Sequence, residues 1–124
     1  MSAGRGPRKG APVARIPEQL AERLGAARPG ELTLLQLSST FCAPCRHARV
    51  LLDDLARRTT GLRHVDVDLT HHPEWADALQ VHSTPTTLVL DPAGAELLRV
   101  AGVPKRAALA EALRPHLPGA AAER

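Results

Sequence analysis

The sequence predicts an α/β domain in which a mixed β-sheet carries helices on both faces. Two strand-like runs, Leu32 to Ser39 and Leu62 to Leu69, are separated by a long amphipathic segment. That alternation is typical of a parallel strand pair joined by a helix. Two further apolar runs, Thr86 to Leu90 and Glu96 to Ala101, flank residues 91–94, whose Asp-Pro-Ala-Gly sequence favours a hairpin turn. We therefore expect about four to five strands and about four helices.

Length and composition predict a single domain. The chain has 124 residues, 44% of them hydrophobic, which suffices for a core without cross-links. Residues 1–15 are expected to form a disordered basic tail, 16–118 the folded domain and 119–124 a flexible C-terminal tail. The formal net charge of +3 is mild, and the basic tail lacks aromatic residues, so we do not expect nucleic-acid binding.

The first half of the domain alternates helix and strand. Pro17 to Leu24 is predicted to be a short helix that ends at Gly25. Leu32 to Ser39 is nearly continuously apolar, as in a buried parallel strand. A short edge strand over Ala11 to Ile16 is a further option. The second helix is predicted from Cys45 to Thr60, because apolar residues recur at helical spacing there, at Ala48, Leu51, Leu52 and Leu55.

The second half adds two helices to the hairpin. Leu62 to Leu69 alternates apolar and polar residues, which is strand spacing. Pro73 opens a predicted helix that runs to Leu79, in which Trp75 is expected to pack against the core. Pro104 to His116 is the predicted last helix.

The chain has two cysteines, Cys42 and Cys45, with two residues between them. They follow a predicted strand and open a predicted helix. The unpaired N–H groups and the dipole at a helix N-terminus favour an anion, and the thiolate is the reactive form of cysteine. The pattern predicts a thiol–disulfide exchange site with Cys42 as the nucleophile. Arg46 adds positive charge nearby.

An alternative interpretation is that Cys42 and Cys45 supply two of the four ligands of a zinc site. Tetrahedral zinc needs four ligands, and the sequence holds no second Cys-x-x-Cys motif. His71 and His72 carry suitable nitrogens, but their spacing from the cysteines fits no zinc-finger pattern. We therefore predict a redox pair and no metal.

A strand, the Phe41-Cys-Ala-Pro-Cys45 motif, a helix and the later Thr84-Pro85 pair together resemble the thioredoxin family. The resemblance covers roughly Ile16 to Leu117. It implies the thioredoxin fold and a thiol–disulfide oxidoreductase in which Cys45 resolves the mixed disulfide formed by Cys42. It also implies no bound cofactor, with electrons supplied by a partner reductase or a thiol pool.

The resemblance further implies a substrate-binding surface. Its residues would be Phe41, Ala43, Pro44, Thr84, Pro85 and Gly102. In the family the proline matching Pro85 is cis, which lets the preceding residue pair with an extended substrate. A rigid turn at Pro85 and a simple strand-to-helix stop at Gly102 are the alternatives. His82 precedes this region and is expected to be a surface loop residue.

Three positions depart from the family pattern. Gln36 stands where the family usually buries an aspartate that exchanges a proton with the resolving cysteine, and an amide cannot do so. A water molecule or His64 is a candidate substitute, although a half-exposed structural histidine is the default expectation. Val50 replaces a proline that kinks the family's second helix, which predicts a straighter helix. The motif has Phe41 and Ala43 in place of tryptophan and glycine.

The leading functional hypothesis is therefore a reductase or exchanger of protein or small-molecule disulfides, acting as a monomer. A specialised oxidant or isomerase is one alternative, and a metal-binding or redox-sensing adaptor is another. No apolar run reaches the roughly 18 residues needed to span a bilayer. We expect a cytoplasmic protein, with a membrane-anchored or exported parent kept as an alternative.

Overall fold

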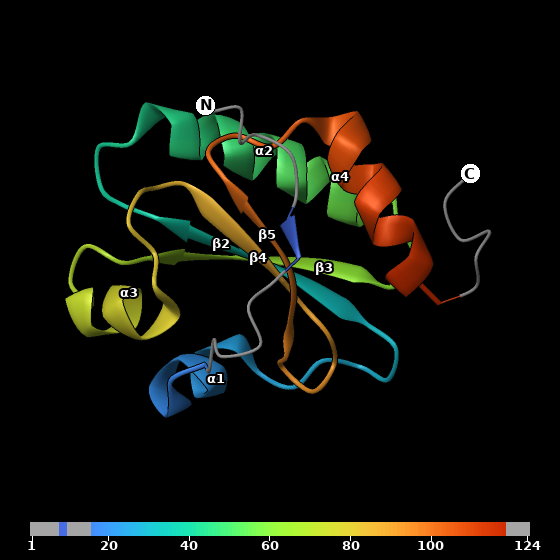
Figure 1. Ribbon diagram of the computed structural model, residues 1–124, viewed down its shortest axis with the longest axis horizontal. Helices are drawn as coiled ribbons and strands as arrows, with labels where there is room; N and C mark the ends of the chain where they lie inside the picture. Colours follow the sequence, from blue (N-terminus) through green and yellow to red (C-terminus); the bar gives the residue numbers. More distant parts are fainter. Residues whose placement is uncertain (1–7, 10–15, 119–124) are drawn as a thin grey trace.

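The computed structural model describes residues 8–9 and 16–118 and folds them around a single sheet (Figure 1). The strands lie in the order β1-β5-β4-β2-β3. In chain order the elements are β1 (Arg8–Lys9), α1 (Glu18–Leu24), β2 (Leu32–Ser38), α2 (Ala43–Arg57), β3 (Leu62–Asp68), α3 (Pro73–Leu79), β4 (Thr86–Leu90), β5 (Glu96–Ala101), α4 (Arg106–Leu113) and a 3₁₀ turn, η1 (Arg114–His116).

The sheet is mixed, as the sequence predicts. β2 pairs with β3 in parallel and with β4 in antiparallel orientation. β4 and β5 form the predicted hairpin, and the two residues of β1 extend the sheet beyond β5. Helices α2 and α4 cover one face, while α1 and α3 cover the other (Figure 1).

Each face of the sheet has its own apolar core. The first core packs Leu34 of β2 against Leu52 of α2 and Leu109 of α4. The second core packs Leu35 of β2 against Leu20 of α1 and Leu79 of α3. Successive strand residues point to opposite faces, so consecutive leucines of β2 supply both cores. This explains why β2 is buried along its whole length.

The same alternation places polar residues at the far end of β2. Gln36 and Ser38 lie on the face covered by α2, two and four positions beyond Leu34. In the parallel register, Gln36 is opposite Asp66, and Leu34 is opposite His64. This face therefore changes from apolar to polar as it approaches the start of α2.

The helices and strands predicted from Pro17 onward are all present, but some of their ends differ. Helix α2 begins at Ala43 rather than Cys45 and ends at Arg57 rather than Thr60. The last predicted helix is shorter: α4 covers Arg106–Leu113, and the chain continues as a 3₁₀ turn. Pro115 explains this change, because a proline lacks the N–H that an α-helix needs at that point.

The N-terminal segment was predicted to be an unstructured tail. Within it, Arg8–Lys9 instead pair with β5, so the prediction is wrong for these two residues. The optional edge strand over Ala11 to Ile16 lies outside the described residues except for Ile16, which is not in a strand. The boundaries at residues 16 and 118 stay predictions. Within the described ranges, no helix is long and apolar enough to cross a bilayer.

Candidate redox site

A disulfide joins Cys42 and Cys45 at the start of α2. The S–S distance is 2.09 Å and the Cα atoms are 5.2 Å apart. Cys42 is half-buried, whereas Cys45 is only 1% exposed. The sulfur of Cys42 is therefore open to a partner, and that of Cys45 is covered.

Cys42 is the N-cap residue of α2. Its Sγ accepts a hydrogen bond from the backbone N–H of Cys45 at 3.2 Å. Its carbonyl oxygen accepts from the N–H groups of Cys45 and Arg46 at 3.1 and 3.3 Å. Pro44 occupies the first turn, where its missing N–H costs no helical hydrogen bond. No acidic residue lies in this turn, so no side chain of the turn opposes the positive end of the helix dipole at the sulfur.

Two loops lie at the same end of the sheet as the disulfide, one before β4 and one after β5. The Thr84–Pro85 bond is cis, and the Thr84 hydroxyl contacts Cys42 Sγ at 3.8 Å. The Thr84 and Ser39 hydroxyls are 2.8 Å apart. Gly102 donates its N–H to the carbonyl oxygen of Pro85 at 2.8 Å, which ties the two loops together. Thr84 thus lies beside Cys42, and Gly102 is joined to this loop through the buried Pro85.

The surface around Cys42 is partly apolar. The Phe41 side chain is 99% exposed, and its backbone adopts a left-handed φ of 61°. Ala43 and Pro44 are also exposed. A fully exposed aromatic beside a reactive sulfur offers apolar contact area to a partner. Arg46 is exposed one turn into the helix and brings positive charge to this surface.

Gln36 is fully buried and is hydrogen-bonded to the turn that holds Cys45. Its Nε2 donates to the Cys45 carbonyl oxygen at 2.8 Å and to Ser38 Oγ at 3.1 Å. Its Oε1 lies 2.9 Å from His64 Nε2. All the polar atoms of this side chain are therefore in use. The neutral amide therefore holds the first turn of α2 in place through its hydrogen bond to the Cys45 carbonyl oxygen, an interaction we call the brace.

His64 as a whole residue is half-buried, but its side chain is only 6% exposed, so the imidazole itself is more covered than the half-exposed histidine expected from the sequence. Helix α2 covers it, and Nδ1 lies 3.9 Å from Asp53 Oδ1. Burial lowers the pKa of His64 below its usual value of 6.5, against the opposing pull of Asp66 and Asp53. The imidazole is accordingly neutral at pH 7.

A second branch of hydrogen bonds leaves Gln36 through Ser38. Ser38 Oγ donates to Asp66 Oδ1 at 2.5 Å, and Asp66 accepts from Arg49 Nε at 2.8 Å. Ser38, Ser39 and Asp66 belong to the site but were not predicted from the sequence. The signal was present for Ser38 and Asp66, because strand alternation puts them on the face of Gln36 and His64.

The residues considered for metal binding do not form a metal site. Among the described residues, no group of three or more His, Cys, Asp or Glu side chains could hold an ion. His72 instead stacks on Trp75 with ring centroids 3.7 Å apart. Trp75 is 4% exposed, which confirms its packing role, and His82 is exposed.

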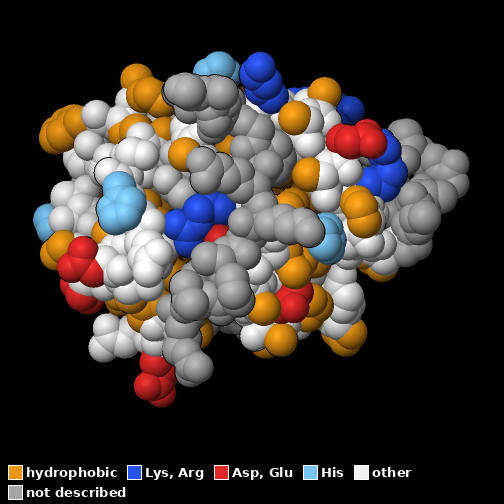
Figure 2. All heavy atoms as spheres, viewed as in Figure 1, with side chains coloured by type: hydrophobic (Ala, Val, Ile, Leu, Met, Phe, Trp, Pro, Cys, Tyr) orange, Lys and Arg blue, Asp and Glu red, His pale blue; other side chains and the backbone are white. Residues whose placement is uncertain are grey.

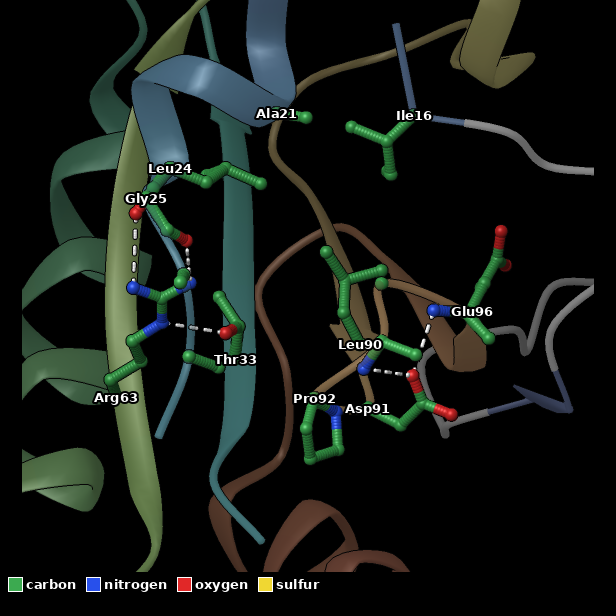
Figure 3. Close-up of a pocket in the computed structure, with 15 residues that line it drawn as sticks. Ile16, Ala21, Leu24, Gly25, Thr33, Arg63, Leu90, Asp91, Pro92 and Glu96 are labelled. Carbon is green, nitrogen blue, oxygen red and sulfur yellow. Dashed lines mark hydrogen bonds between the residues drawn. The ribbon is translucent and has the colours of Figure 1, made fainter. Parts of the chain in front are cut away.

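A pocket lies at the opposite end of the sheet, lined by residues such as Ile16, Leu24 and Leu90 (Figure 3). Arg63 spans its wall and donates to Thr33 Oγ1, Leu24 O and Gly25 O at 2.7–3.0 Å. These bonds fasten the end of α1 to the sheet. Thr33 is the second residue of β2, whereas Cys42 follows the far end of that strand, so the pocket contributes no group to the disulfide.

Comparisons with known proteins agree with this geometry. The thioredoxin family model matches residues 18–115. Thioredoxin of Mycobacterium tuberculosis is 34% identical over 86 residues, which cover 68% of this chain and 73% of that protein. Putative thioredoxin H10 of Arabidopsis thaliana is 29% identical over 79 residues, covering 64% of this chain. The chain spans about half the length of this plant relative, with 51% of it covered.

Solved structures show the same fold. Thioredoxin NaTrxh of Nicotiana alata superposes with a TM-score of 0.67 at 20% identity, covering 90% of this chain and 96% of that one. The four longer strands and four helices described above correspond to this α/β fold. The predicted fold class is therefore confirmed.

Proposed function

The chain belongs to the thioredoxin family, and on that premise we propose that it is a thiol–disulfide oxidoreductase. The observation that carries the proposal is the Cys42–Cys45 disulfide, which closes the first turn of α2 with Cys42 at the N-cap. Family members work through their redox-active cysteines without a cofactor.

The proposed cycle starts from the reduced pair. The Cys42 thiolate attacks one sulfur of a substrate disulfide, that bond breaks, and the leaving sulfur takes up a proton. The Cys45 thiolate then attacks Cys42 Sγ, which re-forms the intramolecular disulfide and releases the second substrate thiol. Two electrons pass from the cysteine pair to the substrate. A partner disulfide reductase or a thiol pool restores the dithiol.

The assignment of roles follows from exposure. Cys42 is the half-buried sulfur, so an incoming disulfide reaches it first. Cys45 is covered and acts within the molecule. We assign substrate contact to the apolar surface at Phe41, Ala43 and Pro44, and to the loops that hold Thr84, Pro85 and Gly102. Arg46 would favour thiolate at Cys42 through its charge.

The proposed substrates are protein and small-molecule disulfides. We propose that the protein acts on them as a monomer in the cytoplasm. On the face in Figure 2, basic, acidic and histidine side chains of the described residues are interspersed. The described residues of this face form no basic stripe of the kind that nucleic-acid binding requires. This supports a proposal without a nucleic-acid partner.

A specialised oxidant or isomerase is the second candidate, and the buried Gln36 favours it. In the family, the reducing members usually hold an aspartate at this position. Direction of exchange depends on a potential that local hydrogen bonds shift by tens of millivolts. The equilibrium potential of the pair discriminates between the two candidates.

Reduction of insulin disulfides with dithiothreitol as electron source tests the proposal. We expect turnover by the native chain, none by Cys42→Ser, and stable mixed disulfides with Cys45→Ser, whose attacking sulfur remains. The two single variants are matched controls for each other. Capture by Cys42→Ser but not by Cys45→Ser would reverse the assigned roles. Metal in stoichiometric amount without turnover would support an adaptor instead.

A further inference from the structure

A continuous chain of buried hydrogen bonds connects His64 to the main chain of Cys45. His64 Nε2 contacts Gln36 Oε1 at 2.9 Å, and Gln36 Nε2 contacts the Cys45 carbonyl oxygen at 2.8 Å. The Gln36 side chain is 0% exposed and that of His64 is 6% exposed. Water therefore does not compete for these bonds, and each contributes more than it would at the surface.

The partners fix the orientation of every group in this chain. Gln36 Nε2 has two hydrogens, and they are directed to the Cys45 carbonyl and to Ser38 Oγ. Ser38 passes its own hydrogen to Asp66. Gln36 Oε1 must then accept, so His64 Nε2 must carry a hydrogen. The neutral imidazole is thus held as the Nε2–H tautomer, with its lone pair on Nδ1.

This arrangement separates His64 from proton chemistry at Cys45. A carboxamide does not accept and pass on a proton near neutral pH, and Gln36 stands between the two residues in the hydrogen-bond chain. Nδ1 is the position that can gain a proton, and it faces Asp53 at 3.9 Å. A proton added there leaves the Nε2–H bond to Gln36 in place.

We propose that His64 is a positioning residue for the Cys42–Cys45 couple, holding the Gln36 amide with its donor toward the Cys45 carbonyl. The inference rests on the proposed function. If His64 loses its donor, Gln36 Oε1 is left buried without a partner. The amide can then rotate away from Cys45 and release the brace.

The brace favours the disulfide over the dithiol. It fixes the backbone at Cys45 while Cys42 is fixed as the N-cap, which keeps the two Cα atoms 5.2 Å apart. That distance lies in the range a disulfide requires. A looser Cys45 lowers the effective concentration of one sulfur at the other. Removal of the brace therefore shifts the couple toward the dithiol.

The test is the thiol–disulfide equilibrium constant of the pair, measured by alkylation and mass spectrometry in glutathione buffers. We expect His64→Leu to lower the constant for disulfide formation on the order of tenfold, equivalent to about 30 mV. His64→Gln keeps an N–H donor at the same reach and should restore the native value within about twofold. His116→Leu and His116→Gln, at an exposed histidine on η1, are matched controls.

A double variant separates positioning from a general packing effect. If His64 acts through Gln36, His64→Leu should add little to the constant once Gln36→Leu is present. Additive effects, an unchanged constant in His64→Leu, or failure of His64→Gln to restore it would each overturn the inference.

One measurement needs no variant, in case His64→Leu does not fold. Long-range proton–nitrogen NMR of the native chain should show His64 as the Nε2–H tautomer in both redox states. The Nδ1–H tautomer in the oxidised chain would refute the orientation. Both the tautomer and the equilibrium constant can be measured on a chain that shows no turnover. Failure of the insulin assay would therefore count against the proposed function and not against the role of His64.

Discussion

The two faces of the sheet are built differently, although the same strands supply both. On the face covered by α1 and α3, Leu35 and Leu37 of β2 pack into an apolar core, and the polar Thr33 lies at the far end of the strand from the disulfide, where it accepts a hydrogen bond from Arg63. On the face covered by α2 and α4, Leu34 is followed by Gln36 and Ser38, and a buried hydrogen-bond network replaces apolar packing near the disulfide.

The difference separates stability from redox chemistry. An apolar core contributes through area removed from water and has little directional effect on a sulfur at its edge. A buried amide fixed by three hydrogen bonds acts on one particular turn. We therefore expect substitutions on the α1/α3 face to change the free energy of unfolding, and those around Gln36 to change the disulfide equilibrium.

Leu35→Ala should have the largest effect on stability. Leu35 is fully buried in the apolar core, so its truncation should lower the free energy of unfolding by about 2–5 kcal/mol. Urea unfolding followed by circular dichroism measures this loss. The disulfide equilibrium constant of the folded variant should stay within about twofold of the native value. A tenfold shift in that constant would mean that the faces are not independent.

Gln36→Leu should show the converse behaviour. The substitution removes the brace on Cys45, so we expect the constant for disulfide formation to fall on the order of tenfold, or about 1.4 kcal/mol. Redox titration in glutathione buffers gives this constant. Ser38→Ala is a control, because it removes one partner of Gln36 and leaves the bond to Cys45. An equal shift in both variants would place the effect elsewhere.

His64 should make the stability of the polar face depend on pH. Its folded pKa lies below 6.5, so the unfolded chain binds a proton more readily. Its contribution is fully present above pH 6.5 and is lost as the pH falls through the folded pKa. Urea unfolding at pH 7.5 and 5.5 should show a larger loss in the native chain than in His64→Gln. Equal losses would contradict the lowered pKa.

Thr87 should give the smallest effect. It lies opposite Gln36 in the register and is fully buried, and among the described residues its hydroxyl has no hydrogen-bond partner. Thr87→Val keeps the shape and removes this group, so we expect unfolding stability to rise by up to about 1 kcal/mol. Thermal unfolding measures the change. A loss of that size would show that the hydroxyl is bound to a water molecule.

Much of the fold follows from the sequence pattern because periodicity and turn chemistry are local. Thr86–Leu90 and Glu96–Ala101 form as predicted on either side of their Asp-Pro-Ala-Gly turn. The start of α2 was misplaced by two residues, since Cys42 caps the helix through its sulfur and carbonyl. Cysteine is not among the usual N-cap residues, so the residue type at position 42 did not indicate a helix start there.

The site was predicted in outline, but its network was not. The spacing of Cys42 and Cys45 is enough to predict a redox pair, and the role of Pro85 follows from the resemblance to the thioredoxin family. The burial of His64 depends on coverage by α2, which is a tertiary contact without a local signature. The contact of Ser39 with Thr84 joins residues 45 positions apart and could not be read from the chain.

The equilibrium potential of the Cys42–Cys45 pair tests the account most directly. A redox-active pair should titrate as one two-electron couple between about −270 and −120 mV, the range of exchange proteins. A disulfide that remains intact below about −300 mV would behave as a structural cross-link and would contradict the account.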